Sequence, residues 1–284
     1  MHIKSVLLAL TTYPEPSPVS TVKEAVEFAQ ALGARISAIA CETEIAVPGR
    51  VSKVVDKIID IPLLGAAELK KSIGNASDLL AAFETEARKQ GVFQEAMRPR
   101  FFAHDVPYRL AEYARFSDLT LVPVPEGDFV DQWYAESIIF GAGRAVVIMP
   151  YTRRTERPVS LNTVAIAWDF SRNAARAVGD ALPLLEKAKL VRVFTVTNEK
   201  MFDWTHSGEE LAKFLARHGI SVILDKIDAG GKKIGDVFEA YIAAHRVDLL
   251  VMGAYGHSKF RQFILGGATR QMLTHPPIPI LMSY

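Results

Sequence analysis

The sequence predicts an α/β protein built from two parallel-sheet domains in tandem. The chain has 284 residues, which is more than the ~100 to 200 residues of an ordinary single domain. One pattern of strands and helices occurs twice along it. In both copies short apolar runs alternate with helical stretches, and this is typical of strands that are covered by helices on both faces of a parallel sheet.

The repeat is clearest at the start of each half. Ser5–Leu10 resembles Thr163–Trp168 in its pattern of apolar residues, and we expect both segments to be strands. Each is followed by a stretch whose apolar residues share one face at helical spacing: Val22, Ala25, Val26, Ala29 and Leu32 in the first half, and Ala174, Ala177, Val178, Ala181 and Leu185 in the second. Internal similarity of this kind indicates a duplicated unit.

The repeat continues to the end of each half. A second strand is expected at residues 36–40 and 191–196. Each half then has a helix, an apolar strand and a closing strand: 108–115, 118–122 and 147–151 in the first half, and 237–245, 248–252 and 280–284 in the second. The predicted domains are residues 1–151 and 159–284, and Thr152–Pro158 is a polar linker that ends in proline.

The first half carries an insertion at about residues 42–77 that has no counterpart of equal length in the second. Its segment 54–64 is apolar enough to pack on another surface. Two interpretations are open: an elaborated crossover that covers sheet or interface surface, or a lid or partner groove.

The composition excludes several classes of protein. Lys and Arg number 33 against 32 Asp and Glu, and this balance argues against a nucleic-acid partner. No apolar run reaches the ~18 residues that a membrane span needs, and the N-terminal strand lacks a small-residue cleavage site, so we expect a cytoplasmic protein without membrane contact. Cys41 is the only cysteine, which excludes an internal disulfide, and the scattered histidines predict no metal site.

The most specific motif is a set of spaced glycines, Gly253, Gly256 and Gly266, followed by Gly267 and Thr269. It begins where the expected strand 249–252 ends and finishes where a helix starts. Ligands of open α/β sheets bind at the carboxyl ends of strands, and the free N–H groups of a helix N-terminus suit a phosphate. The placement of these glycines therefore predicts a phosphate cradle.

In this motif, and in its place near the C-terminus, residues 161–284 resemble the universal stress protein family, whose nucleotide-binding members carry G-x2-G-x9-G followed by Ser or Thr. The resemblance implies an adenine nucleotide alpha-hydrolase-like fold with five-stranded parallel sheets, and ATP as the ligand, possible with Mg²⁺. It implies that Asp169 faces the adenosine end and that Val196 contacts the base. The remaining site residues that it implies are Met252, Gly253, Gly256, Gly266, Gly267, Ala268 and Thr269.

The chain departs from the family pattern in two places. Gly267 stands where the phosphate-contacting Ser or Thr is expected, which removes one donor worth ~1 kcal/mol net. The first half lacks the motif altogether, because Pro123 and Pro125 follow its strand and cannot donate N–H groups. We interpret the first half as a degenerate copy that does not bind ATP in the family manner, although Gly141–Arg144 could hold an anion.

Single residues of the motif also have purely structural interpretations. Asp169-Phe170-Ser171 is equally typical of a helix N-cap. Gly253 and Gly256, taken alone, could form an ordinary tight turn, and Cys41 and Tyr134 could simply fill the core. Only the joint placement of the glycines favours a nucleotide.

The leading functional hypothesis is a stress-related regulatory protein that binds ATP or another adenine nucleotide in its second half, with little or no hydrolysis. The alternative is a non-enzymatic interaction module that has lost nucleotide binding, and an adenylate-forming enzyme is a third, weaker possibility. Relatives of this type pair their last strands antiparallel, so we expect Val147–Met149 to pair with Ile280–Met282 in an intramolecular pseudo-dimer. An unidentified protein partner and a homodimer of tandem chains are further expectations.

Overall fold

The computed structural model of the protein describes residues 2–46, 61–127, 132–151, 160–197, 207–254 and 267–284. The strands of the first half are β1 (Ser5–Leu10), β2 (Arg35–Ala40), β3 (Glu42–Glu44), β4 (Phe93–Met97), β5 (Arg100–Phe102), β6 (Leu119–Val124) and β7 (Ala145–Pro150). Those of the second half are β8 (Thr163–Ala167), β9 (Leu190–Thr197), β10 (Val222–Asp228), β11 (Leu249–Gly253) and β12 (Ile280–Ser283).

Helices connect these strands in both halves. The first half has α1 (Val19–Leu32), α2 (Ile61–Lys89), α3 (Val106–Ala114) and α4 (Gln132–Gly141). The second half has α5 (Arg172–Leu185), α6 (Ser207–Arg217), α7 (Ile234–His245) and α8 (Gly267–Thr274). In the described part of the chain, no helix is both long and apolar enough to cross a membrane.

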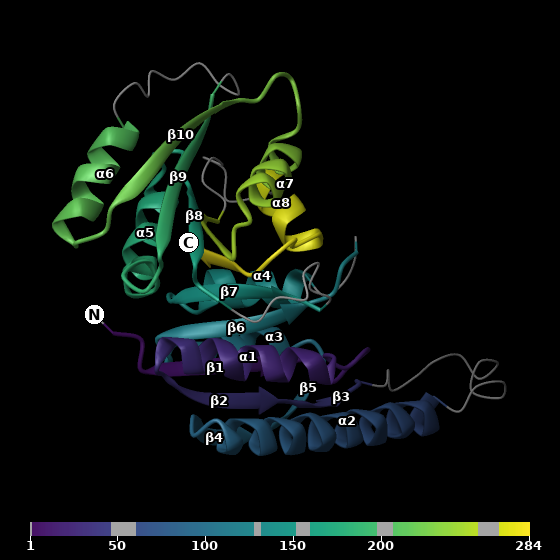
Figure 1. The fold of residues 1–284 in the computed structure, drawn as a ribbon. Helices are drawn as coiled ribbons and strands as arrows, with labels where there is room; N and C mark the ends of the chain where they lie inside the picture. The colour runs from purple at the N-terminus through teal and green to yellow at the C-terminus, as the bar shows by residue number, and fades with distance from the viewer. Residues whose placement is uncertain (1, 47–60, 128–131, 152–159, 198–206, 255–266) are drawn as a thin grey trace.

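One ten-stranded sheet runs through the whole molecule in the order β10-β9-β8-β11-β12-β7-β6-β1-β2-β4 (Figure 1). Each half contributes five strands that are parallel to one another, and the two halves join through the antiparallel pair β7 and β12. At that junction Leu281 lies opposite Val147. The predicted fold class and the predicted pairing of the two closing strands are therefore confirmed.

Both faces of the sheet are covered by helices, which is why the strands are apolar throughout. One core cluster combines side chains of α1, α2, α5 and α6 with one face of the sheet, and the second combines those of α3, α4, α7 and α8 with the other face. Figure 1 shows this in the second half, where α5 and α6 lie on one side of β8–β10 and α7 and α8 on the other. The helical faces predicted for α1 and α5 are the faces that are buried.

The same polar contact anchors the first strand in each half. The Asp118 carboxylate accepts from the backbone N–H groups of Lys4 and Ser5, at 2.9 and 3.0 Å. The Asp248 carboxylate accepts from the N–H of Thr163 at 2.9 Å. The repeat therefore includes an equivalent hydrogen bond between neighbouring strands, from β1 to the start of β6 in the first half and from β8 to the start of β11 in the second.

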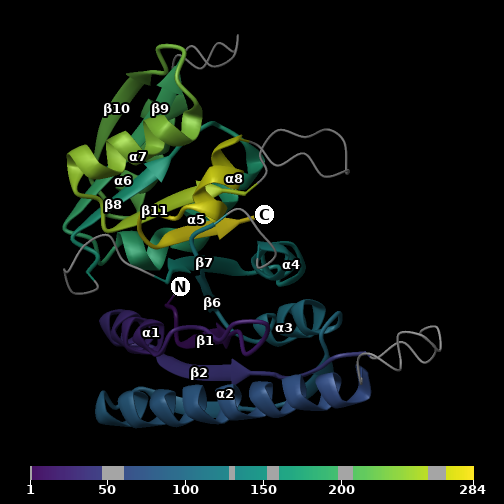
Figure 2. The ribbon, with the colours of Figure 1, turned by 90° about the vertical axis from the view of Figure 1, so that its right-hand side faces the viewer.

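The first half differs from the second mainly by α2, which covers the outer part of its sheet (Figure 2). Leu79 and Phe83 of α2 are buried in the first core cluster. The helix runs to Lys89, past the end of the predicted insertion at about 42–77. Residues 47–60, which include most of the apolar segment, and residues 152–159 lie outside the described part, and the domain boundaries 1–151 and 159–284 stay a prediction.

Candidate functional site

The order of strands in the second half creates a topological switch point at one end of its sheet. From β8 the chain proceeds to β9 on one side and later returns to β11 on the other. The registers place Ala167 opposite Phe194 and Val251 opposite Ile166. The carboxyl ends of these three strands therefore meet at one level, and this is the place where open α/β sheets bind ligands.

Asp169 and Ser171 build the turn that leads from β8 into α5. The Ser171 hydroxyl caps the helix by accepting from the N–H of Ala174 at 3.0 Å. The exposed Asp169 carboxylate accepts from the N–H of Ser171 at 2.9 Å. The N-cap interpretation is therefore confirmed for Ser171, and Asp169 shapes the turn at the edge of the sheet.

Phe170, between these two residues, has a left-handed backbone with a φ of 59°, which is uncommon for a bulky residue. Its ring is 57% exposed and meets the ring of Trp168 edge to face, with 6.1 Å between centroids. Trp168 is itself buried, and its indole N–H has no hydrogen-bond partner within the described residues. Two aromatic side chains therefore stand beside Asp169 at the end of β8.

Gly253 ends β11 directly against the first turn of α5. A Cβ atom at this position would lie 2.5 Å from the backbone nitrogen of Ala174 and 2.6 Å from the carbonyl carbon of Asn173, and neither backbone atom can move aside cheaply. The buried Asn173 side chain donates a hydrogen bond to the carbonyl of Ala254. Glycine is therefore required here so that α5 can approach the strand, and Asn173 fixes the path of the chain as it leaves β11.

The start of α8 supplies the remaining described part of the motif. Gly267 is its first residue and is exposed, and no atom of the described residues lies within 4 Å of a Cβ built on it. Ala268 is partly buried, and Thr269 is only 4% exposed. Gly256 and Gly266 lie outside the described residues.

The predicted site residues thus fall into two groups. The registers bring Asp169, Val196 and Gly253 to the same edge, next to the buried Met252. The three residues that begin α8 follow the segment 255–266, which the structure does not describe. The assignment of all nine residues to a ligand site stays a prediction.

Sequence reasoning missed Asn173 and Trp168 as parts of this edge. Asn173 had a detectable signal, since it is a polar residue beside the apolar positions of α5. Trp168 had none, because an aromatic residue at the end of a strand is commonly core.

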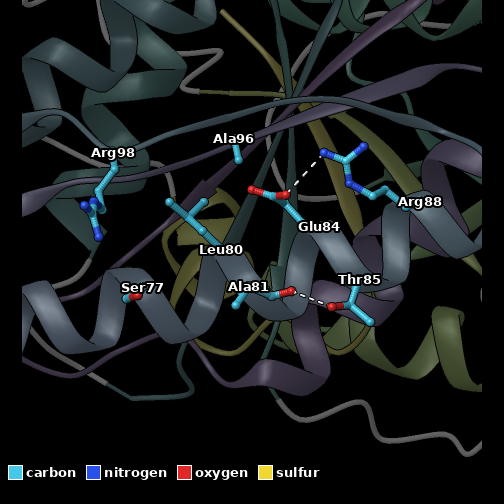
Figure 3. A pocket seen from close by; sticks show the side chains of 8 residues that line it. All are labelled: Ser77, Leu80, Ala81, Glu84, Thr85, Arg88, Ala96 and Arg98. Atoms are coloured by element: carbon cyan, nitrogen blue, oxygen red, sulfur yellow. Dashed lines mark hydrogen bonds and ion pairs between the residues drawn. The ribbon is translucent and has the colours of Figure 1, made fainter.

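A recess of about 570 Å³ lies between α2 and β4 in the first half, away from this edge of the sheet. Figure 3 shows Glu84 pointing toward Arg88, one turn further along α2, and their ion pair measures 3.3 Å. Arg98, at the far side, pairs with Glu42 at 3.2 Å. Because both arginines are already paired, this recess is poorly suited to a phosphate.

A polar cluster in the second half joins β9, β10 and α7. The Tyr241 hydroxyl donates to Asp225 at 2.6 Å, and Arg192 donates to the same carboxylate at 3.1 Å. Burial and the bond to Asp225 raise the pKa of Tyr241. The three groups satisfy one another, so we interpret the cluster as structural. Among the described residues, no group of three or more His, Cys, Asp or Glu side chains could hold a metal ion.

The universal stress protein family model matches residues 161–283. The second half of this chain is thus similar in sequence to the universal stress proteins. The family match covers the second half, and the solved structures extend the likeness of fold to the first half. Among curated proteins, no sequence matches the chain.

Two of the similar structures match this chain over nearly its whole length. A universal stress protein from Archaeoglobus fulgidus has a TM-score of 0.71 and 14% identity, and the match covers 98% of this chain and 97% of that one. A protein from Pseudomonas aeruginosa UCBPP-PA14, named as belonging to the same family, has a TM-score of 0.60 and 13% identity, with 99% and 93% covered. At these identities the likeness establishes the fold alone, and this likeness of fold spans both halves of the chain.

Proposed function

We propose that this protein is a stress-related regulatory protein that binds ATP or another adenine nucleotide in its second half, with little or no hydrolysis. One observation carries the proposal. The glycine motif connects the end of β11, at the switch point of the sheet, to the N-terminus of α8. The proposal extends to a protein partner that senses the nucleotide, and to association of two such chains.

The described residues fit the parts of a nucleotide. Asp169 is exposed at the end of β8, where it could accept from a ribose or base. Within the described residues no atom lies near a Cβ built on Gly267, and the first N–H groups of α8, with the positive end of the helix dipole, suit a phosphate. The motif from Gly253 to Thr269 contains no Asp or Glu, and we therefore propose binding with little turnover; Mg²⁺ would enter with the phosphates.

The interaction module without a nucleotide remains the competing function. Gly267 favours it, because a hydroxyl at that position would add a donor toward the phosphates. Gly267→Ser can test this position without a steric clash, because a serine side chain would meet no neighbour within the described residues.

Calorimetric titration with ATP and with adenosine tests the proposal. We expect Gly267→Ser to bind ATP about tenfold more tightly than the natural chain, because a hydrogen bond to a charged group is worth ~1.5 to 3 kcal/mol. Gly267→Ser and the natural chain should bind adenosine equally well, since adenosine carries no phosphate that the serine hydroxyl could contact. Gly179→Ser, in the open middle of α5, is the matched control. Absence of ATP binding in both the natural chain and Gly267→Ser would favour the interaction module.

A further inference from the structure

The first half contains a small enclosed pocket at the carboxyl ends of β1 and β2. It has a volume of about 240 Å³. The loop Leu10–Pro14 forms one wall, and Cys41 and Thr43 form a second. The start of α3 and Tyr134 of α4 close it, and Figure 2 shows α3 lying beside β1.

This pocket occupies the place that the candidate site has in the second half. The registers of β1 with its two neighbours match those of β8, so residues can be paired one for one between the halves. By this match Thr11 corresponds to Asp169, and Cys41 corresponds to Val196. Both Thr11 and Cys41 line the pocket. The first half thus keeps a cavity at the position that is equivalent to the base end of the other site.

The lining of the pocket excludes a phosphate. Among the described residues no Asp, Glu, Lys, Arg or His contributes to it, and a buried charge without a partner is costly. Burial raises the pKa of the Cys41 thiol to about 12, so this group is neutral too. Pro107, in the first turn of α3, has no N–H to offer an anion.

The same lining suits an uncharged ring. Tyr13, Pro14, Pro107 and Tyr134 present flat apolar surfaces. The Thr12 hydroxyl donates to the Cys41 carbonyl, and so belongs to the wall. An apolar cavity of ~150 Å³ in another protein holds benzene, so 240 Å³ accommodates one ring or two fused rings.

We propose that the pocket between β1, β2 and α3 binds a small uncharged aromatic compound of one or two rings. The first half is then a second ligand site of different chemistry, in which the phosphate cradle is gone and the base end has become a closed cavity. The proposal goes beyond nucleotide binding and does not depend on it.

Ligand-observed NMR of the full chain, with indole and phenol as probes, tests this site. We expect saturable binding of indole with one site per chain, and no displacement by ATP. Val106→Phe places a ring in the pocket and should weaken indole binding at least tenfold. Val19→Phe is the matched control, because Val19 is likewise the first residue of a helix but is 56% exposed and does not line the pocket.

Circular dichroism and the thermal midpoint establish that each variant folds. If Val106→Phe does not fold, Ala103→Leu narrows the same pocket from the loop before α3 and carries the same expectation. Unchanged indole affinity in the folded pocket variant, displacement of indole by ATP, or no saturable binding of either probe would each overturn the proposal. The outcome is independent of whether the second half binds ATP.

Discussion

One helix in each half is followed by a residue with a left-handed backbone, and the two residues differ in how well they suit that conformation. Gly33 follows α1 with a φ of 70°, whereas Arg246 follows α7 with a φ of 52°. A non-glycine residue in this conformation costs roughly 1 to 2 kcal/mol, and Arg246 is exposed. Arg246 therefore carries local backbone strain that Gly33 avoids.

This difference predicts opposite effects of two mirrored substitutions. Arg246→Gly should raise the free energy of unfolding by about 0.5 to 1 kcal/mol, since relief of the strain exceeds the added entropy of the unfolded chain. Gly33→Arg should lower it by about 1 kcal/mol. Urea denaturation of both variants checks the pair. A lower free energy of unfolding in Arg246→Gly would mean that the arginine side chain stabilises the fold by more than the left-handed backbone destabilises it.

The buried Cys41 predicts a dependence of stability on pH. Burial raises the pKa of its thiol from 9.0 to about 12. The thiol therefore ionises in the unfolded chain before it does so in the folded one, and the stability it contributes is lost as the pH rises above 9. From pH 9 to 10 the free energy of unfolding should fall by about 1 kcal/mol more in the natural chain than in Cys41→Ala. Equal slopes for both proteins would contradict the assigned pKa.

At the scale of elements, the contact between β11 and α5 depends on Gly253. Its missing Cβ leaves room for the backbone of Ala174, so Gly253→Ala must push the helix away from the strand. We expect this variant to lose about 1 to 3 kcal/mol of unfolding free energy, as overpacked cores do, and to bind ATP more weakly because Asn173 moves with the helix.

Gly179→Ala gives the matched comparison for that variant. Gly179 lies in α5 as well, with no atom within 4 Å of its built Cβ. Alanine is the better helix former by ~0.5 to 1 kcal/mol, so the control should be stabilised. Thermal or urea unfolding of Gly253→Ala and Gly179→Ala measures this difference in stability. If Gly253→Ala proved as stable as the natural chain, the claim that α5 lies too close to β11 for a Cβ at this position would be contradicted.

Most elements could be predicted from the sequence, and α2 is one of those that could not, together with β4, β10 and α6. The faces of α1 and α5 are regular, and their apolar spacing predicted the buried residues. The sequence of α2 contains Pro62, Gly65 and Gly74, which weaken a helical pattern, and its burial depends on contacts with β2, β3 and β4 that no local pattern records. Tertiary packing therefore decides the length of this helix.

The candidate site could be predicted only in part. The glycine spacing and strand ends gave its position, because they follow from chain order. The left-handed backbone of Phe170 could not be predicted, since a bulky residue disfavours that conformation. The pocket at Thr11 and Cys41 depends on how α3 and α4 close over β1 and β2, and only the folded structure contains that information.

At the scale of the molecule, the antiparallel pair β7 and β12 makes one sheet from two unlike halves. The repeat would allow two equivalent nucleotide sites, at the switch points of both halves. The first half has Thr11 in place of Asp169, no glycine motif, and a closed uncharged pocket. The central claim is therefore that the chain binds an adenine nucleotide once, in its second half.

The stoichiometry of ATP binding tests that claim most directly. Calorimetric titration of the full chain with ATP, together with amide hydrogen exchange of the complex, gives both the number of sites and their place. We predict one ATP per chain, with increased protection at the ends of β9 and β11 and at the start of α8. Two ATP per chain, or protection confined to the ends of β1 and β2, would contradict the account.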